Sequence, residues 1–199
     1  MSAPDISQPA AAPARATGVV ATPANLPAPE EIQRAIRNVP DFPKPGIQFK
    51  DITPVLADAR LFTGAIELLA NDFQPGTVDA VVGIDARGFI FAAAVATRLR
   101  AGFVPIRKKG KLPYQTIEQE YALEYGTATV AIHVDALRPG SRVLLVDDLL
   151  ATGGTAAAAA QLVERLGAHI LEISFLIELS FLRGRERLKG YPVRALVVY

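Results

Sequence analysis

The sequence predicts an α/β fold in which a parallel sheet is covered by helices on both faces. Three patterns between residues 78 and 177 lead to this expectation. The apolar runs are nearly continuous, as in strands that are buried on both sides. They end in polar turns that contain glycine, and helical segments follow the turns, as in strand–helix–strand units. Ligands of such sheets bind beyond the carboxyl ends of the strands, so the turns are candidate binding loops.

Residues 1–29 differ in composition from the rest of the chain. They contain six of the fifteen prolines and nine alanines, with Asp5 and Arg15 as their only charged residues. Because this segment has few large apolar residues to bury, we expect a disordered tail. It lacks the basic start and the compact apolar run of a secretory signal. Residues 30–199 are expected to form one domain.

The domain is expected to begin with a helix over 30–38, which leads into a loop stiffened by prolines. A second helix is expected over 61–73. Further helices are expected over 89–100 and 156–166, each after a strand and a turn. The four strands expected in the sheet are 78–84, 103–106, 142–146 and 169–177.

The composition argues against several kinds of site. The chain has 21 Lys and Arg against 20 Asp and Glu, so no net field favours nucleic acid. It has no cysteine and only two histidines, His133 and His169, which argues against disulfides and the common zinc sites. Its apolar runs are far shorter than the roughly 20 residues of a membrane helix. We expect a cytoplasmic protein that binds neither nucleic acid nor membranes.

A phosphate-binding loop is predicted after the strand at 142–146. The string VDDLLATGGT at 146–155 leads from this strand into a helix. Its glycines let backbone N–H groups approach an anion, its threonines add hydroxyls, and the helix start contributes its dipole. No Lys-Ser/Thr pair follows the glycines, so a nucleotide-triphosphate loop is not expected. The loop residues are Ala151, Thr152, Gly153, Gly154 and Thr155.

Two acids precede this loop and indicate what else is bound. Asp147 and Asp148 would repel further phosphate, but they suit ribose hydroxyls or a hydrated Mg²⁺. An ordinary strand-to-helix turn is the alternative for a lone Gly-Gly pair. That alternative gives no reason for buried acids beside an anion site. The string therefore predicts a ribose 5-phosphate site.

The string at 146–155 resembles the phosphoribosyl pyrophosphate (PRPP) motif of type I phosphoribosyltransferases in its adenine-specific form. The resemblance runs from about Val39 to the end of the sequence and includes three further motifs. It implies transfer of the 5-phosphoribosyl group from PRPP to N9 of adenine, which gives AMP and pyrophosphate in purine salvage. It further implies a homodimer and Mg²⁺ held mainly through the substrate, with Asp147 and Asp148 as candidate ligands.

The second motif, GIDARGF at 83–89, presents one arginine beside a helix start. The arginine fork matches phosphate oxygens, although an isolated arginine more often forms a surface salt bridge. The resemblance implies that Asp85, Ala86 and Arg87 bind pyrophosphate and that Arg87 takes part in catalysis. It also implies a cis peptide bond near Asp85–Ala86.

The third motif spans about 107–126 and carries four basic residues near its start. Loops of this length are usually lids or disordered, and a β-hairpin with solvated charges is the alternative. The resemblance implies a mobile flap that closes over the reactants. In it, Arg107 and Lys111 bind pyrophosphate, and Glu124 protonates N7 of the purine.

The fourth motif, at about 39–55, is a loop stiffened by prolines that presents aromatic residues. A proline turn with a buried anchor would be the ordinary explanation. The resemblance implies a hood over the base, where Phe49 stacks on adenine and backbone groups near Gln48 and Lys50 read its amino edge. The family has an apolar residue at the first of these two positions and arginine at the second. Since the implied contacts are main-chain, adenine recognition is expected to survive.

Two other functions share parts of this pattern. A hypoxanthine, guanine or xanthine enzyme would have the same sugar site, but the hood argues against it. A non-catalytic regulator that binds PRPP is the alternative from another class. The tail is too featureless for a DNA-binding module, and the flap is intact, so an enzyme is expected.

Overall fold

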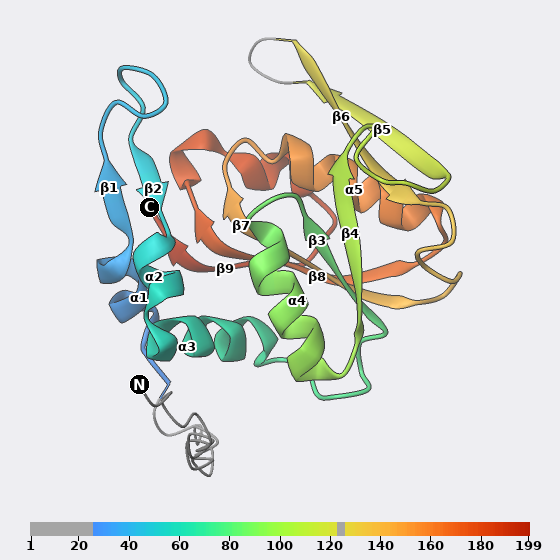
Figure 1. The fold of residues 1–199 in the computed structure, drawn as a ribbon, viewed down its shortest axis with the longest axis horizontal. Coiled ribbons are helices and arrows are strands. Elements are labelled where there is room, and N and C mark those ends of the chain that lie inside the picture. The colour runs from blue at the N-terminus through green and yellow to red at the C-terminus, as the bar shows by residue number, and fades with distance from the viewer. Residues whose placement is uncertain (1–25, 123–125) are drawn as a thin grey trace, which may run out of the picture.

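A computed structural model describes residues 26–122 and 126–199 of the chain (Figure 1). Its centre is a seven-stranded sheet in the order β5-β6-β4-β3-β7-β8-β9. Five strands are parallel: β3 (Ala80–Ile84), β4 (Gly102–Lys108), β7 (Arg142–Leu150), β8 (His169–Glu178) and β9 (Val193–Val198). The antiparallel hairpin of β5 (Thr116–Ala122) and β6 (Thr127–His133) extends the sheet beside β4. The sheet is therefore mixed, with a parallel centre.

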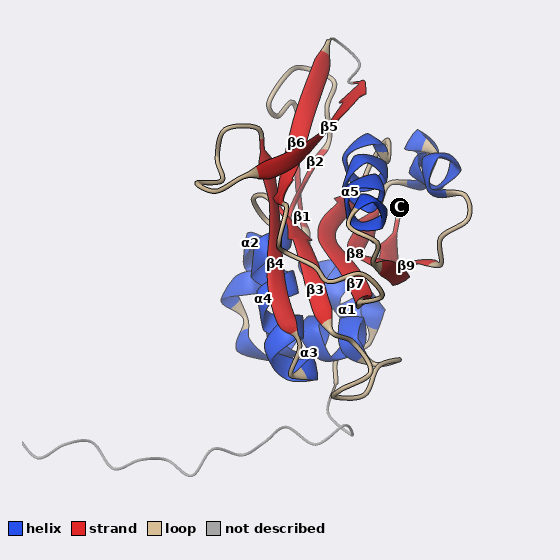
Figure 2. Cartoon of the chain, turned by 90° about the vertical axis from the view of Figure 1, so that its right-hand side faces the viewer, coloured by secondary structure: helices blue, strands red, loops and turns tan. Residues whose placement is uncertain are grey.

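Helices cover both faces of this sheet (Figure 2). One core contains the apolar side chains of the first four helices together with Leu144 and Val146 of β7. The other contains those of the fifth helix together with Val143 and Leu145 of the same strand. The alternation follows from the two-residue period of a strand. The helices are α1 (Pro29–Ala35), α2 (Thr53–Ala57), α3 (Ala59–Ala70), α4 (Gly88–Leu99) and α5 (Gly154–Arg165).

The predicted fold class is confirmed, but several elements differ from the prediction. The helix expected over 30–38 ends at Ala35, because residues 37–39 form a strand that pairs with residues 49–51. The strand expected to end at Val146 continues as β7 to Leu150, because β8 pairs with it along this length. The segment expected as a flap, about 107–126, contains the strand β5, whose backbone pairs with β6 from Thr116 to Ala122. The last strand, β9, was not predicted. Two short 3₁₀ helices, Ser180–Leu182 and Gly184–Leu188, lie between β8 and β9.

A separate two-stranded ribbon forms the base of the hood. β1 (Arg37–Val39) pairs antiparallel with β2 (Phe49–Asp51) through three residue pairs. The ribbon is not hydrogen-bonded to the seven-stranded sheet. In Figure 1 it stands beside the carboxyl end of the chain, at the edge of the molecule.

The chain packs against the domain from Pro27 onward, before the end of the tail expected over residues 1–29. The expected tail lies outside the described residues up to position 25, but Pro27 is buried. A Cβ added to Gly64 of α3 would lie 2.1 Å from the Cδ atom of Pro27, so the two residues are in close contact. α1 then begins at Pro29, a residue suited to the first turn of a helix.

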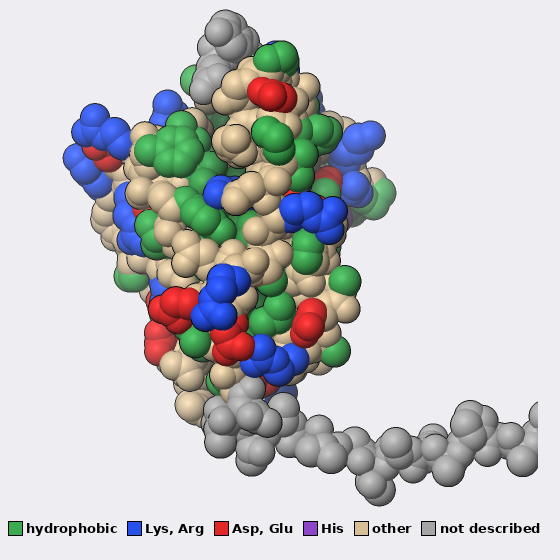
Figure 3. All heavy atoms as spheres, turned by 90° about the vertical axis from the view of Figure 1, so that its left-hand side faces the viewer, with side chains coloured by type: hydrophobic (Ala, Val, Ile, Leu, Met, Phe, Trp, Pro, Cys, Tyr) green, Lys and Arg blue, Asp and Glu red, His purple; other side chains and the backbone are tan. Residues whose placement is uncertain are grey.

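Helix length and surface charge affect whether a protein can cross a membrane or bind nucleic acid. Among them, no helix is both long enough and apolar enough to cross a bilayer. On the face that carries α1 and the hood, acidic and basic side chains are interspersed (Figure 3). This mixture agrees with the formal net charge of +1.

Candidate functional site

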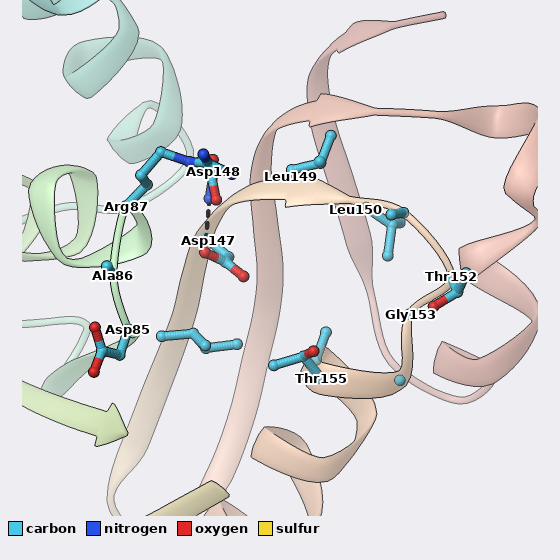
Figure 4. A pocket seen from close by; sticks show the side chains of 14 residues that line it. Asp85, Ala86, Arg87, Asp147, Asp148, Leu149, Leu150, Thr152, Gly153 and Thr155 are labelled. Carbon is cyan, nitrogen blue, oxygen red and sulfur yellow. Dashed lines mark hydrogen bonds and ion pairs between the residues drawn. The ribbon is translucent and has the colours of Figure 1, made fainter. Parts of the chain in front are cut away.

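A cavity of about 370 Å³ opens at the carboxyl ends of β3 and β7. It is lined by residues 84–87 and 147–156, and Figure 4 shows their side chains. Two of the four motifs therefore meet in one cavity, although about 60 residues separate them in the sequence. They meet because neighbouring parallel strands end at the same edge of a sheet.

The loop at 151–155, predicted to bind a phosphate, connects β7 to α5. Gly153 has a φ of +80°, a conformation that residues with a Cβ adopt rarely. No side chain caps the start of α5. The first backbone N–H groups of a helix have no partner within the helix, so those of α5 can bind an anion. Thr152 is exposed and Thr155 is half-buried beside them.

The two acids lie within β7 rather than in the loop. Asp147 Oδ1 accepts a hydrogen bond of 2.9 Å from the backbone N–H of Asp148. A Cβ on Gly88 would lie 2.4 Å from the same oxygen, so glycine at the start of α4 leaves room for this carboxyl. Burial raises the pKa of Asp147 well above its usual value, and the neighbouring charge of Asp148 raises it further.

Arg87 connects the acids to the hood. Its Nε donates a hydrogen bond of 2.5 Å to Asp148 Oδ2 (Figure 4). Its Cζ lies 5.3 Å from the centre of the Phe49 ring. The peptide bond between Asp85 and Ala86, just before it, is cis, as the resemblance implied. Arg87 thus lies between Asp148 and Phe49.

The other residues predicted to bind pyrophosphate lie next to Arg87. Arg107 of β4 donates a hydrogen bond of 3.0 Å from Nε to Asp85 Oδ2. It also donates one of 3.0 Å to the carbonyl oxygen of Lys111. The carboxylate of Asp85 therefore orients Arg107 at the end of the strand beside β3. The side chain of Lys111 is exposed.

The hood places the ring of Phe49 beside Arg87, one of the residues that line the cavity. The ring is half-buried, and the ring of Phe42 packs edge-on against it with centroids 5.1 Å apart. Gln48 is exposed, and Lys50 donates a hydrogen bond of 2.7 Å to Asn38 Oδ1. Glu124, predicted to be the general acid, lies outside the described residues. The strand before it reaches the phosphate loop, because a Cβ on Gly154 would lie 3.2 Å from Tyr121 Cδ2.

The segment 180–188 supports the phosphate loop and was not singled out in the sequence. A Cβ on Gly184 would lie 2.3 Å from the carbonyl oxygen of Ala151, and one on Gly153 would lie 2.4 Å from that of Gly184. Arg185 holds the segment by donating 2.8 and 2.9 Å hydrogen bonds to the buried carboxylate of Glu178. The sequence signal that could have indicated this segment is Glu178, an acid at the end of an apolar run, with Arg185 shortly after it.

Comparison with known proteins agrees with this geometry. Residues 52–195 match the family described as "Phosphoribosyl transferase domain". The chain therefore belongs to the phosphoribosyltransferases. It is 61% identical over 168 residues to the adenine phosphoribosyltransferase of Acidothermus cellulolyticus, an alignment that covers 84% of this chain and 95% of the relative. Within the class, it belongs to the adenine phosphoribosyltransferase family.

Solved structures of the same family have the same fold. The adenine phosphoribosyltransferase of Rhodothermus marinus superposes with a TM-score of 0.82 at 55% identity, over 86% of this chain and 98% of that one. The enzyme of Saccharomyces cerevisiae, solved with D-2,5-dideoxy-2,5-imino-altritol 1,6-bisphosphate and adenine, gives 0.80 at 42% identity. This second comparison covers 84% of this chain and 97% of the yeast chain. The predicted family and fold are confirmed.

Proposed function

We propose that the chain transfers the 5-phosphoribosyl group of PRPP to N9 of adenine and releases pyrophosphate, forming AMP for purine salvage. As a member of its family, it is a pentosyl transferase. The observation that carries the proposal is the single cavity in which a glycine loop, two acids and one arginine meet beside an aromatic hood. These groups match the phosphate, the ribose, the leaving group and the base of the reactants.

On the sugar side, residues 151–155 bind the 5-phosphate through backbone N–H groups and the threonine hydroxyls. Asp147 and Asp148 accept hydrogen bonds from the ribose hydroxyls. In the structure Asp148 accepts one from Arg87 instead. PRPP binding therefore exchanges partners: Arg87 turns to the pyrophosphate, and Asp148 is freed for the ribose. After the exchange, the guanidinium of Arg87 is paired with the pyrophosphate, and the carboxylate of Asp148 accepts hydrogen bonds from the ribose.

On the pyrophosphate side, the developing negative charge of the leaving group is stabilised by Arg87, Arg107 and Lys111, with Asp85 and Ala86 shaping the turn. Positioned cations contribute most where charge develops in the transition state. Arg107 is already held by Asp85, so little reorganisation is needed when the pyrophosphate departs.

On the base side, Phe49 stacks on adenine, and the backbone near Gln48 and Lys50 reads the 6-amino edge. Glu124 of the flap protonates N7 as the bond to N9 forms. The flap closes over the ribosyl centre, which is oxocarbenium-like in the transition state, and excludes water that would otherwise trap it.

Magnesium fits this site as a partner of the substrate. Among the described residues, no group of three or more His, Cys, Asp or Glu side chains could form a metal site. Asp147 and Asp148 offer carboxylate oxygens beside the ribose, and Mg²⁺ commonly combines one or two carboxylates with substrate phosphates and water. When bound with PRPP, the ion would neutralise pyrophosphate charge. The proposal also includes a homodimer in the cytoplasm.

The test is to incubate the purified chain with Mg²⁺ and PRPP and to offer adenine, hypoxanthine or guanine. We expect AMP from adenine, with kcat/KM for adenine at least about 10⁴-fold above that for hypoxanthine. Hypoxanthine would set its 6-oxygen against a main-chain acceptor, a mismatch of about 1–3 kcal/mol for each buried group. If hypoxanthine or guanine came within tenfold of adenine, the 6-oxopurine function would replace this proposal.

A further inference from the structure

The hood needs an anchor that its own strands do not supply. β1 and β2 pair through only three residue pairs and have no ladder to the main sheet. Isolated two-stranded ribbons are marginally stable in water. Side-chain contacts must therefore hold β2, and with it the main chain of Phe49 and Lys50, at a fixed position above the cavity.

The main chain of Tyr199 is tied to the central sheet. Its N–H donates a hydrogen bond of 2.9 Å to the carbonyl oxygen of Glu178, at the end of β8. Its carbonyl oxygen accepts hydrogen bonds from Ser180, one of 2.9 Å from the backbone N–H and one of 2.6 Å from Oγ. Three hydrogen bonds thus fix the backbone of Tyr199 relative to the sheet.

The side chain of Tyr199 contacts the hood and α1. Lys50 Nζ lies 3.5 Å from the centre of the Tyr199 ring, a cation–π contact. The tyrosine hydroxyl donates a hydrogen bond of 3.3 Å to the carbonyl oxygen of Gln33 in α1. Lys50 in turn donates to Asn38 Oδ1 across the ribbon. In Figure 1 the carboxyl end of the chain lies beside β2, where these contacts form.

The environment of Lys50 strengthens this contact. The side chain is half-buried, and burial lowers the pKa of its ammonium group. A partly desolvated cation gains more from an aromatic face than a fully hydrated one.

We propose that Tyr199 is a positioning residue of the adenine site, which holds β2 against the central sheet through the ammonium group of Lys50. The inference rests on the proposed function, because it assigns the hood to adenine. Tyr199 acts through Lys50 and Gln33 and does not touch the substrates. Its removal lets the ribbon move, which weakens the base site and leaves the PRPP site, built on β3 and β7, intact.

Steady-state kinetics test this separation of the two sites. Tyr199→Ala should raise the KM for adenine about threefold to tenfold, as the loss of a cation–π contact implies, while the KM for PRPP stays within about twofold. Tyr199→Phe keeps the ring and should retain most of the adenine affinity. Lys50→Met should match Tyr199→Ala, and the double variant should be no worse than either single one.

Phe181→Ala is the matched control, because this aromatic residue lies in the same region with a 69% exposed side chain. It should leave both KM values unchanged. An unchanged KM for adenine in Tyr199→Ala, or an equal rise in both KM values, would overturn the inference.

Amide hydrogen exchange tests the same anchor without substrates. In Tyr199→Ala, exchange in residues 37–51 should be faster than in the wild type, while exchange in β3 stays slow. Equal exchange rates in 37–51 would overturn the inference even where the variant remains folded. If the wild type made no AMP, the proposed function would fail, and this measurement would still decide whether Tyr199 anchors the ribbon.

Discussion

At the scale of single residues, the site contains two neighbouring acids that repel each other and two ion pairs between an acid and an arginine. Asp147 is half-buried beside a second acid, and its desolvation and the charge of Asp148 disfavour its ionised form. Asp148 is neutralised by Arg87, and Arg107 by Asp85. The first of these pairs has to open for the proposed reaction, whereas the second can stay. In the proposed reaction, PRPP would replace the ion pair of Arg87 with Asp148 by contacts to the ligand, so neither charge is left without a partner.

Asp147→Asn should make the protein more stable at neutral and alkaline pH. The native pKa of this acid is raised above its usual 3.8, so the native state holds the proton more tightly than the unfolded chain. The native state therefore loses stability as the pH rises above 3.8. The asparagine side chain of the variant cannot ionise, so it avoids this loss, and its oxygen can still accept the hydrogen bond from the backbone N–H of Asp148. Thermal unfolding of both proteins between pH 4 and 8 should show a difference that grows with pH.

Asp79→Asn is the control, because it should change the stability at neutral pH in the opposite direction. Hydrogen bonds from Arg142 lower the pKa of Asp79 to about 2. Its contribution to stability is therefore present above 3.8 and lost as the pH falls toward 2. The amide variant should be less stable than the wild type at pH 7, with the difference vanishing in acid. A gain in stability at pH 7 from both substitutions would contradict the assigned causes.

Arg87→Ala should impair the use of PRPP far more than the binding of AMP. The guanidinium is assigned to the pyrophosphate, which AMP lacks. Loss of such a contact in the transition state is worth about 3 kcal/mol, or on the order of a hundredfold in kcat/KM for PRPP. The measurements are forward kinetics and the Kd for AMP. Equal losses for both ligands would assign Arg87 to the 5-phosphate or to a structural role.

At the scale of elements, the phosphate loop depends on a segment that follows it by about 30 residues. The backbones of 151–153 and of Gly184 approach each other more closely than side chains allow. The pair of Arg185 and the buried Glu178 holds the 180–188 segment in place. The main chain at Gly184 therefore supports the loop, whose residues line the cavity.

Gly184→Ala should raise the KM for PRPP while the KM for adenine changes much less. The added methyl group would lie 2.3 Å from the carbonyl oxygen of Ala151, so the loop has to shift. A displacement of this kind can cost on the order of tenfold to a hundredfold in kcat/KM. Gly102→Ala is the control, because its nearest neighbour would be at 3.6 Å, an ordinary contact. Similar kinetics for the two variants would remove Gly184 from loop positioning.

At the scale of the whole molecule, the site lies where the topology brings distant segments together. β3 and β7 are adjacent in the sheet, so the turn at 85–88 and the loop at 151–155 share a cavity. Phe49 of the hood lies beside Arg87, which lines this cavity, and Tyr199, just after β9, contacts Lys50 at the base of the hood. The helices on each face stabilise the sheet whose edge carries these loops.

Two truncations should separate the amino-terminal tail from the domain. Removal of residues 1–25 should leave activity and the free energy of unfolding nearly unchanged, because their composition offers little to bury. Removal of 1–28 should cost about 2 kcal/mol, because it also takes away the buried Pro27 and the residue that precedes α1. Chemical denaturation of the three proteins gives both values. Equal stability of the two truncated proteins would contradict the role of Pro27.

The sequence by itself determined the fold class and the family, and it predicted the phosphate loop. The apolar strands, the VDDLLATGGT string and the GIDARGF turn are local signals, because strand burial and loop chemistry depend on residues that are close in the chain. The ends of α3, α4 and β8 were also predicted within a few residues, since glycine and charged residues interrupt their patterns.

Only the tertiary structure decided which distant groups meet. The pairing of β7 with β8 put both acids inside a strand, and adjacent strand ends placed Arg87 on Asp148. The contact of Gly153 with Gly184 and that of Lys50 with Tyr199 join segments that have no shared periodicity or motif. Such contacts depend on the register and order of the strands. A single sequence does not reveal these contacts. Each partner is compatible with its own strand or loop whether or not the other residue lies near it.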